Sequence, residues 1–172
     1  MWLVAQRPAL DRIDAQLVEL LQDDGRRPYA ELGSDVGISG PSAHERVKKL
    51  EARGVVSGYS AVVDPAALGY GVLAFTWLTQ APGSAGSAGS DLTTAFAQIV
   101  EIEECHHIAG EADYLLKIRA RDTRDLERII QRLQTTAHVF TTETDVVLSS
   151  AFERRPLRVA RTPAETDEPG ET

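Results

Sequence analysis

The sequence predicts an α+β chain in which a winged-type helix-turn-helix unit is followed by a ferredoxin-like domain of the order βαββαβ. Two observations carry this prediction. Three short segments with helical spacing of their apolar residues come first, and glycines separate them. Strand-like and helix-like segments then follow through the second half of the chain, in the order that is typical of a split βαβ fold.

The first two helices are predicted from apolar spacing and from residues that begin or end helices. The first runs from about Asp11 to Asp24, because leucine and isoleucine side chains recur there on one face of a helix. Gly25 is a favourable residue just beyond a helix end. The second helix is expected to begin near Pro28, since proline is favoured in the first turn, and to end at Gly37.

The third helix has two candidate starting points. Ser39 can cap it with Pro41 in the first turn, or Ser42 can cap it with Glu45 completing a capping box. Gly54 ends the helix in either case. Two helices joined by a short glycine turn, here at about residues 29–48, form the helix-turn-helix layout. The β-rich residues 55–63 are then expected to form a strand that leads out of this unit.

The second domain is expected to hold one sheet. Its strands are predicted where β-branched and aromatic residues gather, at about 71–79, 103–109, 113–120 and 141–148. Amphipathic helices are predicted near residues 92–99 and 126–133. Because the strands carry apolar residues on both sides, we expect the helices to cover one face of the sheet and a second copy of the chain to cover the other.

These elements divide the chain into three parts. We expect a helix-turn-helix domain at residues 9–64, a ferredoxin-like domain at residues 65–158, and a disordered acidic tail at residues 159–172. The tail carries threonine, proline and acidic residues and almost no apolar side chains. It therefore cannot bury enough surface to become ordered.

Composition narrows the class of protein. No apolar stretch approaches the roughly 20 residues that cross a bilayer, and the N-terminus lacks the layout of a secretory signal. We therefore expect a cytoplasmic protein without membrane contact. The single Cys105 cannot form an intramolecular disulfide. The adjacent His106 and His107 would point to opposite faces of a strand, so we expect no metal and no resident cofactor.

Several motifs, in order, resemble the Lrp/AsnC (feast/famine) family of regulators from about residue 10 to residue 157. They are Leu10–Asp14, Leu20–Arg26, Glu31–Leu32, Val36–Ser39, Glu45–Val56, Gly58–Tyr59, Glu104–His106 and Gly110–Leu116. The resemblance implies a bacterial or archaeal transcription regulator that binds double-stranded DNA. It also implies that the second domain oligomerises and binds a small-molecule effector, which we expect to be an amino acid.

The third helix of the chain is the second helix of the helix-turn-helix motif, and in such motifs that helix enters the major groove. It therefore supplies the predicted DNA contacts. The predicted residues lie in its first turn or on its solvent side: Ser39, Pro41, Ser42, His44, Glu45, Arg46, Lys48 and Lys49. Arg46 is expected to pair with a guanine edge or to clamp a phosphate. Lys48 and Lys49 are expected to bind phosphate. The net charge of −8 argues against attraction of the whole protein surface to DNA. The alternative for the charged residues of the third helix is that they form an ordinary solvated helix face.

The resemblance places an effector pocket at the hairpin between the second and third strands. The residues that it implies are His107, Ala109, Gly110, Glu111, Asp113, Tyr114, Thr142 and Thr144. Asp113 is the residue expected to bind an ammonium group. A glycine hairpin that binds no ligand is the alternative, because such a turn needs no ligand to explain it.

The resemblance also implies a homodimer that assembles further, and an octamer of four dimers is the hypothesis. Two reading helices per dimer imply an operator with two-fold symmetry. We expect no enzymatic activity, but two other functions stay open. One is a siroheme-decarboxylase-like enzyme, for which His106, His107 and His138 are available, and visible absorption with a tetrapyrrole would support it. The other is a ligand-independent architectural protein that wraps DNA, and a footprint of low specificity would support that reading.

Overall fold

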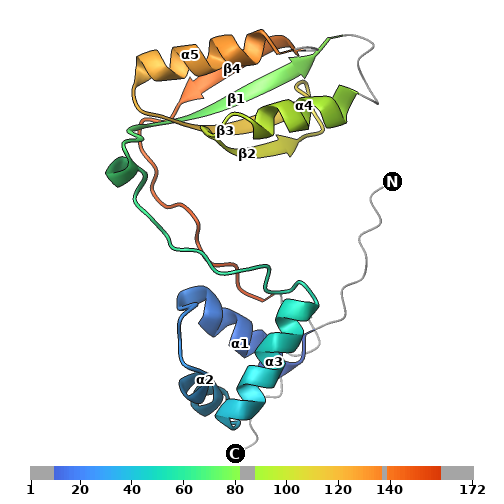
Figure 1. Ribbon diagram of the computed structural model, residues 1–172, viewed down its shortest axis with the longest axis vertical. Coiled ribbons are helices and arrows are strands. Elements are labelled where there is room, and N and C mark those ends of the chain that lie inside the picture. Colours follow the sequence, from blue (N-terminus) through green and yellow to red (C-terminus); the bar gives the residue numbers. More distant parts are fainter. Residues whose placement is uncertain (1–9, 82–87, 137–138, 160–172) are drawn as a thin grey trace, which may run out of the picture. The chain divides into compact units, whose positions relative to one another are not determined.

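The computed structural model describes residues 10–81, 88–136 and 139–159. The chain divides into two compact units (Figure 1). One comprises the chain up to Ala61 together with the segment from Phe152, and the other runs from Val62 to Ala151. We had expected residues 62–64 in the first part and residues 152–158 in the second. The expected tail beyond residue 159 and His138 lie outside the described residues.

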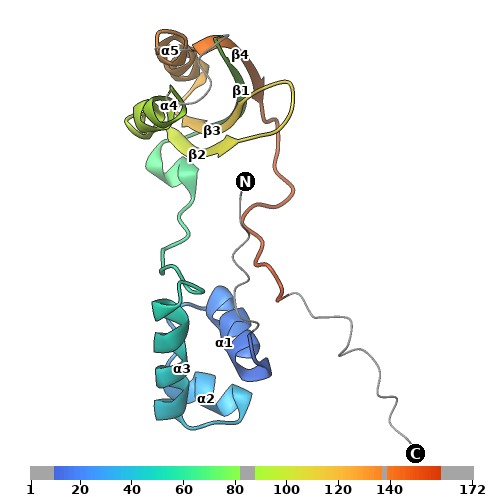
Figure 2. The ribbon, with the colours of Figure 1, turned by 90° about the vertical axis from the view of Figure 1, so that its right-hand side faces the viewer.

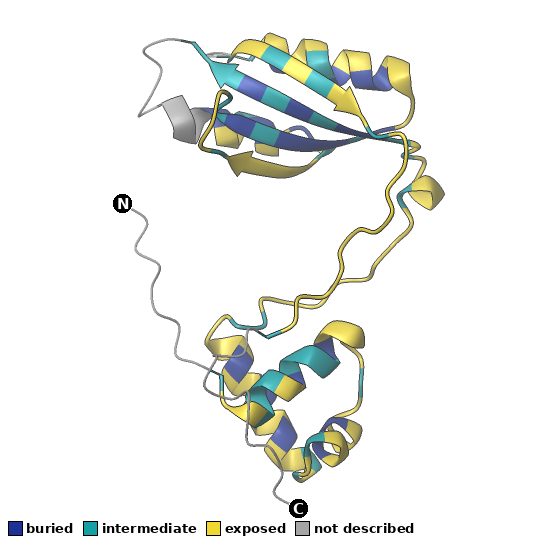
Figure 3. Ribbon diagram, turned by 180° about the vertical axis from the view of Figure 1, so that it is seen from behind, coloured by how far each residue is buried: buried dark blue, intermediate teal, exposed yellow. Residues whose placement is uncertain are grey.

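Three helices form the first unit: α1 (Arg12–Asp23), α2 (Tyr29–Val36) and α3 (Gly40–Ala52). Asp11 caps α1, because its carboxylate accepts a hydrogen bond from the amide of Asp14 at 2.7 Å. The apolar stripes of the three helices meet in one core (Figure 3). Its fully buried side chains are Leu17, Leu32, Ala43, Val47 and Leu50.

The turn between α2 and α3 is tightly specified. Gly37 has a φ of 74°, which favours glycine, and the amide of Ile38 donates to the carbonyl of Gly33 at 2.8 Å. A Cβ on Gly33 would lie 2.7 Å from the carbonyl oxygen of Ile38 in this turn, so a larger residue does not fit there. Ser39 caps α3 by accepting from the amide of Ser42 at 3.2 Å. The earlier of the two candidate starting points is therefore the one that the helix uses.

Residues 55–63 do not form the strand that we expected. The described part of the chain has one sheet, in the second unit, and this segment is not in it. A strand needs a neighbour to satisfy its backbone donors and acceptors, and none of the described segments pairs with residues 55–63. Residues 57–63 are exposed instead. The chain then enters a short 3₁₀ helix, Pro65–Leu68, which Asp64 caps.

The second unit has the predicted ferredoxin-like order. Its elements are β1 (Val72–Gln80), α4 (Ala88–Ala97), β2 (Ile102–His107), β3 (Tyr114–Ala120), α5 (Thr123–Gln134) and β4 (Val139–Val146). The sheet order is β2-β3-β1-β4, and each neighbouring pair is antiparallel. Both helices cover the same face of this sheet (Figure 2). The α+β prediction is confirmed.

The two faces of the sheet differ. The face toward the helices carries buried side chains such as Ala74, Leu78, Leu116 and Ile118. The alternate residues on the other face include Leu73, Phe75, Trp77, Leu115 and Lys117. No helix of this unit covers that second face within the described residues. A sheet with apolar residues on both faces needs a further cover.

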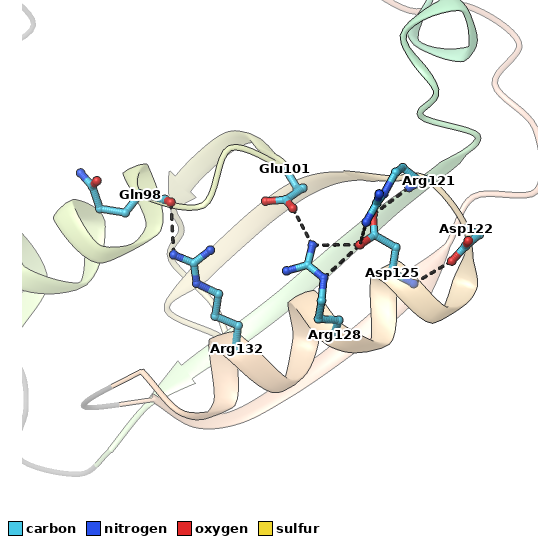
Figure 4. Close-up of polar contacts among 7 residues, drawn as sticks. All are labelled: Gln98, Glu101, Arg121, Asp122, Asp125, Arg128 and Arg132. Atoms are coloured by element: carbon cyan, nitrogen blue, oxygen red, sulfur yellow. Dashed lines mark hydrogen bonds and ion pairs between the residues drawn. The ribbon is translucent and has the colours of Figure 1, made fainter.

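Asp125 fixes α5 to the loops around it (Figure 4). Its carboxylate accepts from the amide and the Nε of Arg121, both at 3.1 Å, and from Nη2 of Arg128 at 2.9 Å. Arg128 also donates to Glu101 at 2.6 Å. The hydrogen bonds from Arg121 and Arg128 hold the pKa of Asp125 well below its usual range.

Within the described residues, no helix is both long and apolar enough to cross a membrane. The same part of the chain contains no group of three His, Cys, Asp or Glu side chains that could hold a metal ion.

Candidate functional site

The outward face of α3 follows from its buried face. Ala43, Val47 and Leu50 are fully buried, so the side chains half a turn away point to solvent. These exposed residues are Pro41, Ser42, Glu45, Lys48 and Lys49. Neither lysine forms an ion pair with any other described residue. The helix therefore presents two available ammonium groups to solvent.

Arg46 is turned toward α1 instead. Its Nη1 donates to Oδ2 of Asp11 at 2.6 Å and to Oδ1 of Asp14 at 2.7 Å. The hydrogen bonds to Asp11 and Asp14 raise the pKa of Arg46. The pKa of Asp11 is lowered, first by the amide of Asp14 and then by Arg46. The arginine that we expected to contact DNA is thus ion-paired to α1, although about a third of its side chain stays exposed.

Three other predicted residues also have partners within this unit, since the hydroxyl of Ser42 lies 2.8 Å from that of Ser39. Ser39 serves as the cap of α3. The ring of His44 packs on the ring of Tyr29 in α2, with 4.6 Å between their centroids. The structure therefore brings Pro41, Ser42, Glu45, Lys48 and Lys49 to one exposed face, and places Ser39, His44 and Arg46 at its margins.

The second candidate site is a cavity of about 640 Å³ beside the hairpin between β2 and β3. Its lining comes from β1, the hairpin and β4. The lining residues are Trp77, Thr79, Ile108, Gly110, Glu111, Ala112, Thr141, Glu143 and Asp145. Gly110 and Glu111 are the two predicted effector residues among them. The cavity lies on the sheet face opposite the helices, since it is lined by Trp77, the cross-strand partner of Glu143.

Asp113 has a structural partner. Its Oδ2 accepts from the amide of Gln80 at 2.7 Å, and its own amide donates to the carbonyl of Leu78 at 2.9 Å. These bonds hold the hairpin against the end of β1. The residue expected to bind an ammonium group is therefore engaged with the backbone, outside the lining of the cavity.

The predicted threonines lie on the opposite face of β4. The hydroxyl of Thr144 is 2.9 Å from that of Thr76, which is fully buried. The hydroxyl of Thr142 accepts from Nε2 of Gln134, on α5, at 2.9 Å. Because neighbouring side chains alternate along a strand, the cavity receives Thr141, Glu143 and Asp145 in place of the threonines on either side of Glu143.

The remaining predicted effector residues also lie outside this lining. Tyr114 is buried, with its ring edge-on to Phe96, and burial raises its pKa. His107 packs on Tyr114, with 5.1 Å between ring centroids, and Ala109 is exposed in the hairpin. The sequence reasoning missed Glu143 and Asp145. The alternation of β4 against the aromatic residues of β1 was the signal that could have identified them.

The fold and the two sites define a class: a transcription regulator in which a helix-turn-helix unit is joined to a separate ligand-binding domain. An AsnC-type helix-turn-helix domain matches residues 10–51, and the Lrp/AsnC ligand binding domain matches residues 74–157. The chain is 40% identical over 147 residues to the HTH-type transcriptional regulator LrpA of Mycobacterium tuberculosis, covering 86% of this chain and 95% of that protein. The chain therefore belongs to the Lrp/AsnC family.

Further relatives agree. The leucine-responsive regulatory protein of Escherichia coli K12 is 38% identical over 121 residues, covering 70% of this chain and 73% of that protein. A solved feast or famine regulatory protein from M. tuberculosis, complexed with L-methionine, has a TM-score of 0.81 and 38% identity, and the match covers 88% of this chain and all of that one. A transcriptional regulator from Neisseria meningitidis in complex with L-methionine has a TM-score of 0.78 and 27% identity, covering 84% and 94% of the two chains.

Proposed function

We propose that this chain is a sequence-specific DNA-binding regulator that presents α3 to the major groove and changes its DNA binding when an amino acid occupies the hairpin cavity. The observation that carries the DNA part is the outward face of α3, where Lys48 and Lys49 have no acidic partner among the described residues. Lysines placed in this way neutralise phosphates. A regulator, not an enzyme, is the proposal.

The proposed reading surface is Pro41, Ser42, Glu45, Lys48 and Lys49. Ser42 and Glu45 lie near the N-terminal end of α3, which is the end that contacts base edges in this motif. Glu45 can accept from the amino group of cytosine. The two lysines follow along the exposed face and bind the phosphate backbone, which sets the register of the helix.

The proposed effector is a free amino acid, as in the relatives solved with L-methionine. Glu111, Glu143 and Asp145 are the carboxylates of the cavity, and an ammonium group is the cation of an amino acid that they can bind. Trp77 offers an apolar surface for a side chain. Asp113 and Thr144 then support the site from outside it.

The proposed assembly is a homodimer formed through the open face of the sheet, with a higher oligomer, an octamer of four dimers, as its final state. Phe75, Trp77 and Leu115 on this face are half-buried, although no helix of the unit covers them within the described residues, and they support the dimer because apolar side chains that stay partly open to solvent mark interfaces. The proposed location is the cytoplasm, where DNA and free amino acids are both present. Light scattering tests the assembly, and a mass equal to one dimer at working concentration would exclude the octamer.

The effector proposal is tested by thermal unfolding of the full chain with each of the twenty amino acids. A ligand that binds only the folded state raises the midpoint by mass action. We expect one or two amino acids to raise it, and Glu143→Gln to reduce that rise. Glu127→Gln is the matched control, because Glu127 is exposed on α5, outside the cavity. No rise with any amino acid would exclude the amino-acid proposal and direct the search to tetrapyrroles and other metabolites.

A further inference from the structure

We infer that Arg46 is a positioning residue that holds α3 against α1 through Asp11 and Asp14, and that it does not itself contact DNA. This inference rests on the proposed DNA-binding function of α3. It changes the role of the one arginine in the middle of the reading helix, since such an arginine would otherwise be the first candidate for a bidentate contact to guanine.

The place of Arg46 on α3 directs its side chain toward α1. Arg46 lies one turn after Ala43 and one turn before Leu50, both of which are fully buried, so it lies at the border between the core and the outward face. It lines an open groove together with Ser42 and Lys49, but its guanidinium is directed to α1. Its side chain is 34% exposed, against 13% for that of Asp14. Lys49, three residues later, lies closer to the outward face and is exposed.

The carboxylate of Asp11 has two roles, since it caps α1 and forms an ion pair with Arg46. Oδ1 of Asp11 caps the first turn of α1, while its Oδ2 accepts from Arg46 at 2.6 Å. Asp14, one turn into α1, accepts from the same Nη1 at 2.7 Å and also lies 3.8 Å from Nη1 of Arg53 at the end of α3. The start of α1 is thus tied to the middle and the end of α3 at once.

These ion pairs between α1 and α3 determine the direction in which Lys48 and Lys49 project. Ion pairs at two points along α3 limit its rotation and tilt relative to α1, so the reading face is preorganised before DNA arrives. Releasing Arg46 to a phosphate would leave the mostly buried carboxylate of Asp14 with only the longer contact to Arg53. Breaking a partly buried pair from one side is costly, which favours retention of the pair in the DNA complex.

The test measures DNA affinity of the full chain by fluorescence anisotropy, from about 50 to about 200 mM salt. One probe is a duplex selected by the unaltered protein from a randomised pool, and the other is a scrambled duplex of the same composition. Circular dichroism sets a temperature at which every variant is folded. If no duplex is preferred over its scrambled form even by the unaltered protein, the proposed function fails, and this outcome is distinct from those below.

Two variants with opposite charge changes should have the same effect. We expect Arg46→Ala and Asp14→Asn each to weaken binding of the selected duplex roughly tenfold and to reduce its advantage over the scrambled duplex. We expect the salt dependence of both variants to match that of the unaltered protein, because neither loses a phosphate contact. Lys49→Ala should instead lower the salt slope by about one for each bound subunit.

The matched control is Asp23→Asn. It removes the same charge from the same helix, but Asp23 is exposed and has no basic partner among the described residues. Its affinity should stay equal or rise, because a negative charge is lost. The inference is overturned if Asp14→Asn behaves like this control, or if Arg46→Ala lowers the salt slope as Lys49→Ala does.

A charge exchange gives a second test, because the double variant again pairs an arginine with a carboxylate between α1 and α3. Arg46→Asp should abolish the preference for the selected duplex, and adding Asp14→Arg to it should restore part of that preference. An arginine that contacts DNA directly predicts no restoration, because the exchanged arginine would lie on α1. Absence of restoration in a folded double variant therefore contradicts the positioning role.

Discussion

The helix-turn-helix unit and the sheet domain differ in how far the side-chain direction changes from one residue to the next. A predicted site that is shifted by one residue is therefore affected differently in the two domains. Along α3, each residue turns about 100° from the last, so several adjacent residues share the outward side, and only Arg46 among the charged residues predicted there turns back to the protein. Along β4, each residue turns to the opposite face. The predicted Thr142 and Thr144 therefore lie on the helix side, while Thr141, Glu143 and Asp145 line the cavity.

The largest effect is expected from the outward face of α3. The double variant Lys48→Ala/Lys49→Ala should weaken DNA binding by a dimer roughly hundredfold or more, and reduce the salt slope by about one per lysine and bound subunit. Both lysines are exposed and unpaired among the described residues. Affinity measured over a range of salt concentrations checks this. Arg124→Ala on α5 is the control, and an equal loss for that variant would indicate that DNA contacts are not concentrated on α3.

A second prediction extends the comparison to α5, a helix within the sheet domain. Asp125→Ala should lower the free energy of unfolding by about 2 kcal/mol, because it removes charged hydrogen bonds to Arg121 and Arg128. Urea unfolding followed by circular dichroism measures this change. Glu127→Gln on the exposed side of the same helix should change stability by less than about 0.5 kcal/mol.

Asp125 also predicts a pH dependence. Its pKa is depressed in the folded state, so its stabilising contribution is present above the unfolded pKa, near 3.8, and is lost as the pH falls toward the folded value. The unaltered protein should therefore lose stability below about pH 4 more steeply than Asp125→Ala. Urea midpoints between neutral pH and the acid limit measure the difference, and parallel curves would contradict the assigned network.

The two faces of β4 are compared directly by neighbouring substitutions. Thr144→Val should cost about 1–2 kcal/mol of stability, because it leaves the hydroxyl of buried Thr76 without its partner, and should leave ligand binding unchanged. Glu143→Gln should do the reverse: little change in stability and a weaker ligand-induced rise in the unfolding midpoint. If Thr144→Val abolishes the ligand response of a protein that still folds, the assignment of faces is incorrect.

The sequence predicted elements better than it predicted which side chains meet. Helical spacing and glycines were sufficient for α1, α2 and α3, because their own stripes form the core. The strand expected at residues 55–63 failed because β structure depends on a partner that local sequence does not contain. Asp113 was placed in a binding role by the family resemblance and its charge, and Arg46 by its position on the second helix of the motif and its charge. Their actual partners, the amide of Gln80 and the carboxylates of Asp11 and Asp14, are distant in sequence.

The smallest effect concerns the segment after residue 151, which the sequence placed with the sheet domain. Gln22 on α1 donates to the carbonyl of Leu157 at 2.8 Å and accepts from its amide at 3.0 Å. Because these groups are exposed, Gln22→Ala should lower the stability of the helix-turn-helix unit by only about 0.5–1 kcal/mol. Thermal unfolding compares it with Gln16→Ala, an exposed glutamine on the same helix. An equal effect of both variants would show that the contact to Leu157 adds no stability.

The central prediction is that ligand binding in the sheet domain is coupled to DNA binding by the helix-turn-helix unit. Affinity for the selected duplex is measured by fluorescence anisotropy with and without each amino acid that raises the unfolding midpoint. We predict that at least one of them changes the DNA dissociation constant, and that the duplex changes the affinity for that amino acid by the same factor. Glu143→Gln should lose this coupling, whereas Thr144→Val should retain it. Tight, selective DNA binding that no amino acid alters would contradict an amino-acid-responsive regulator.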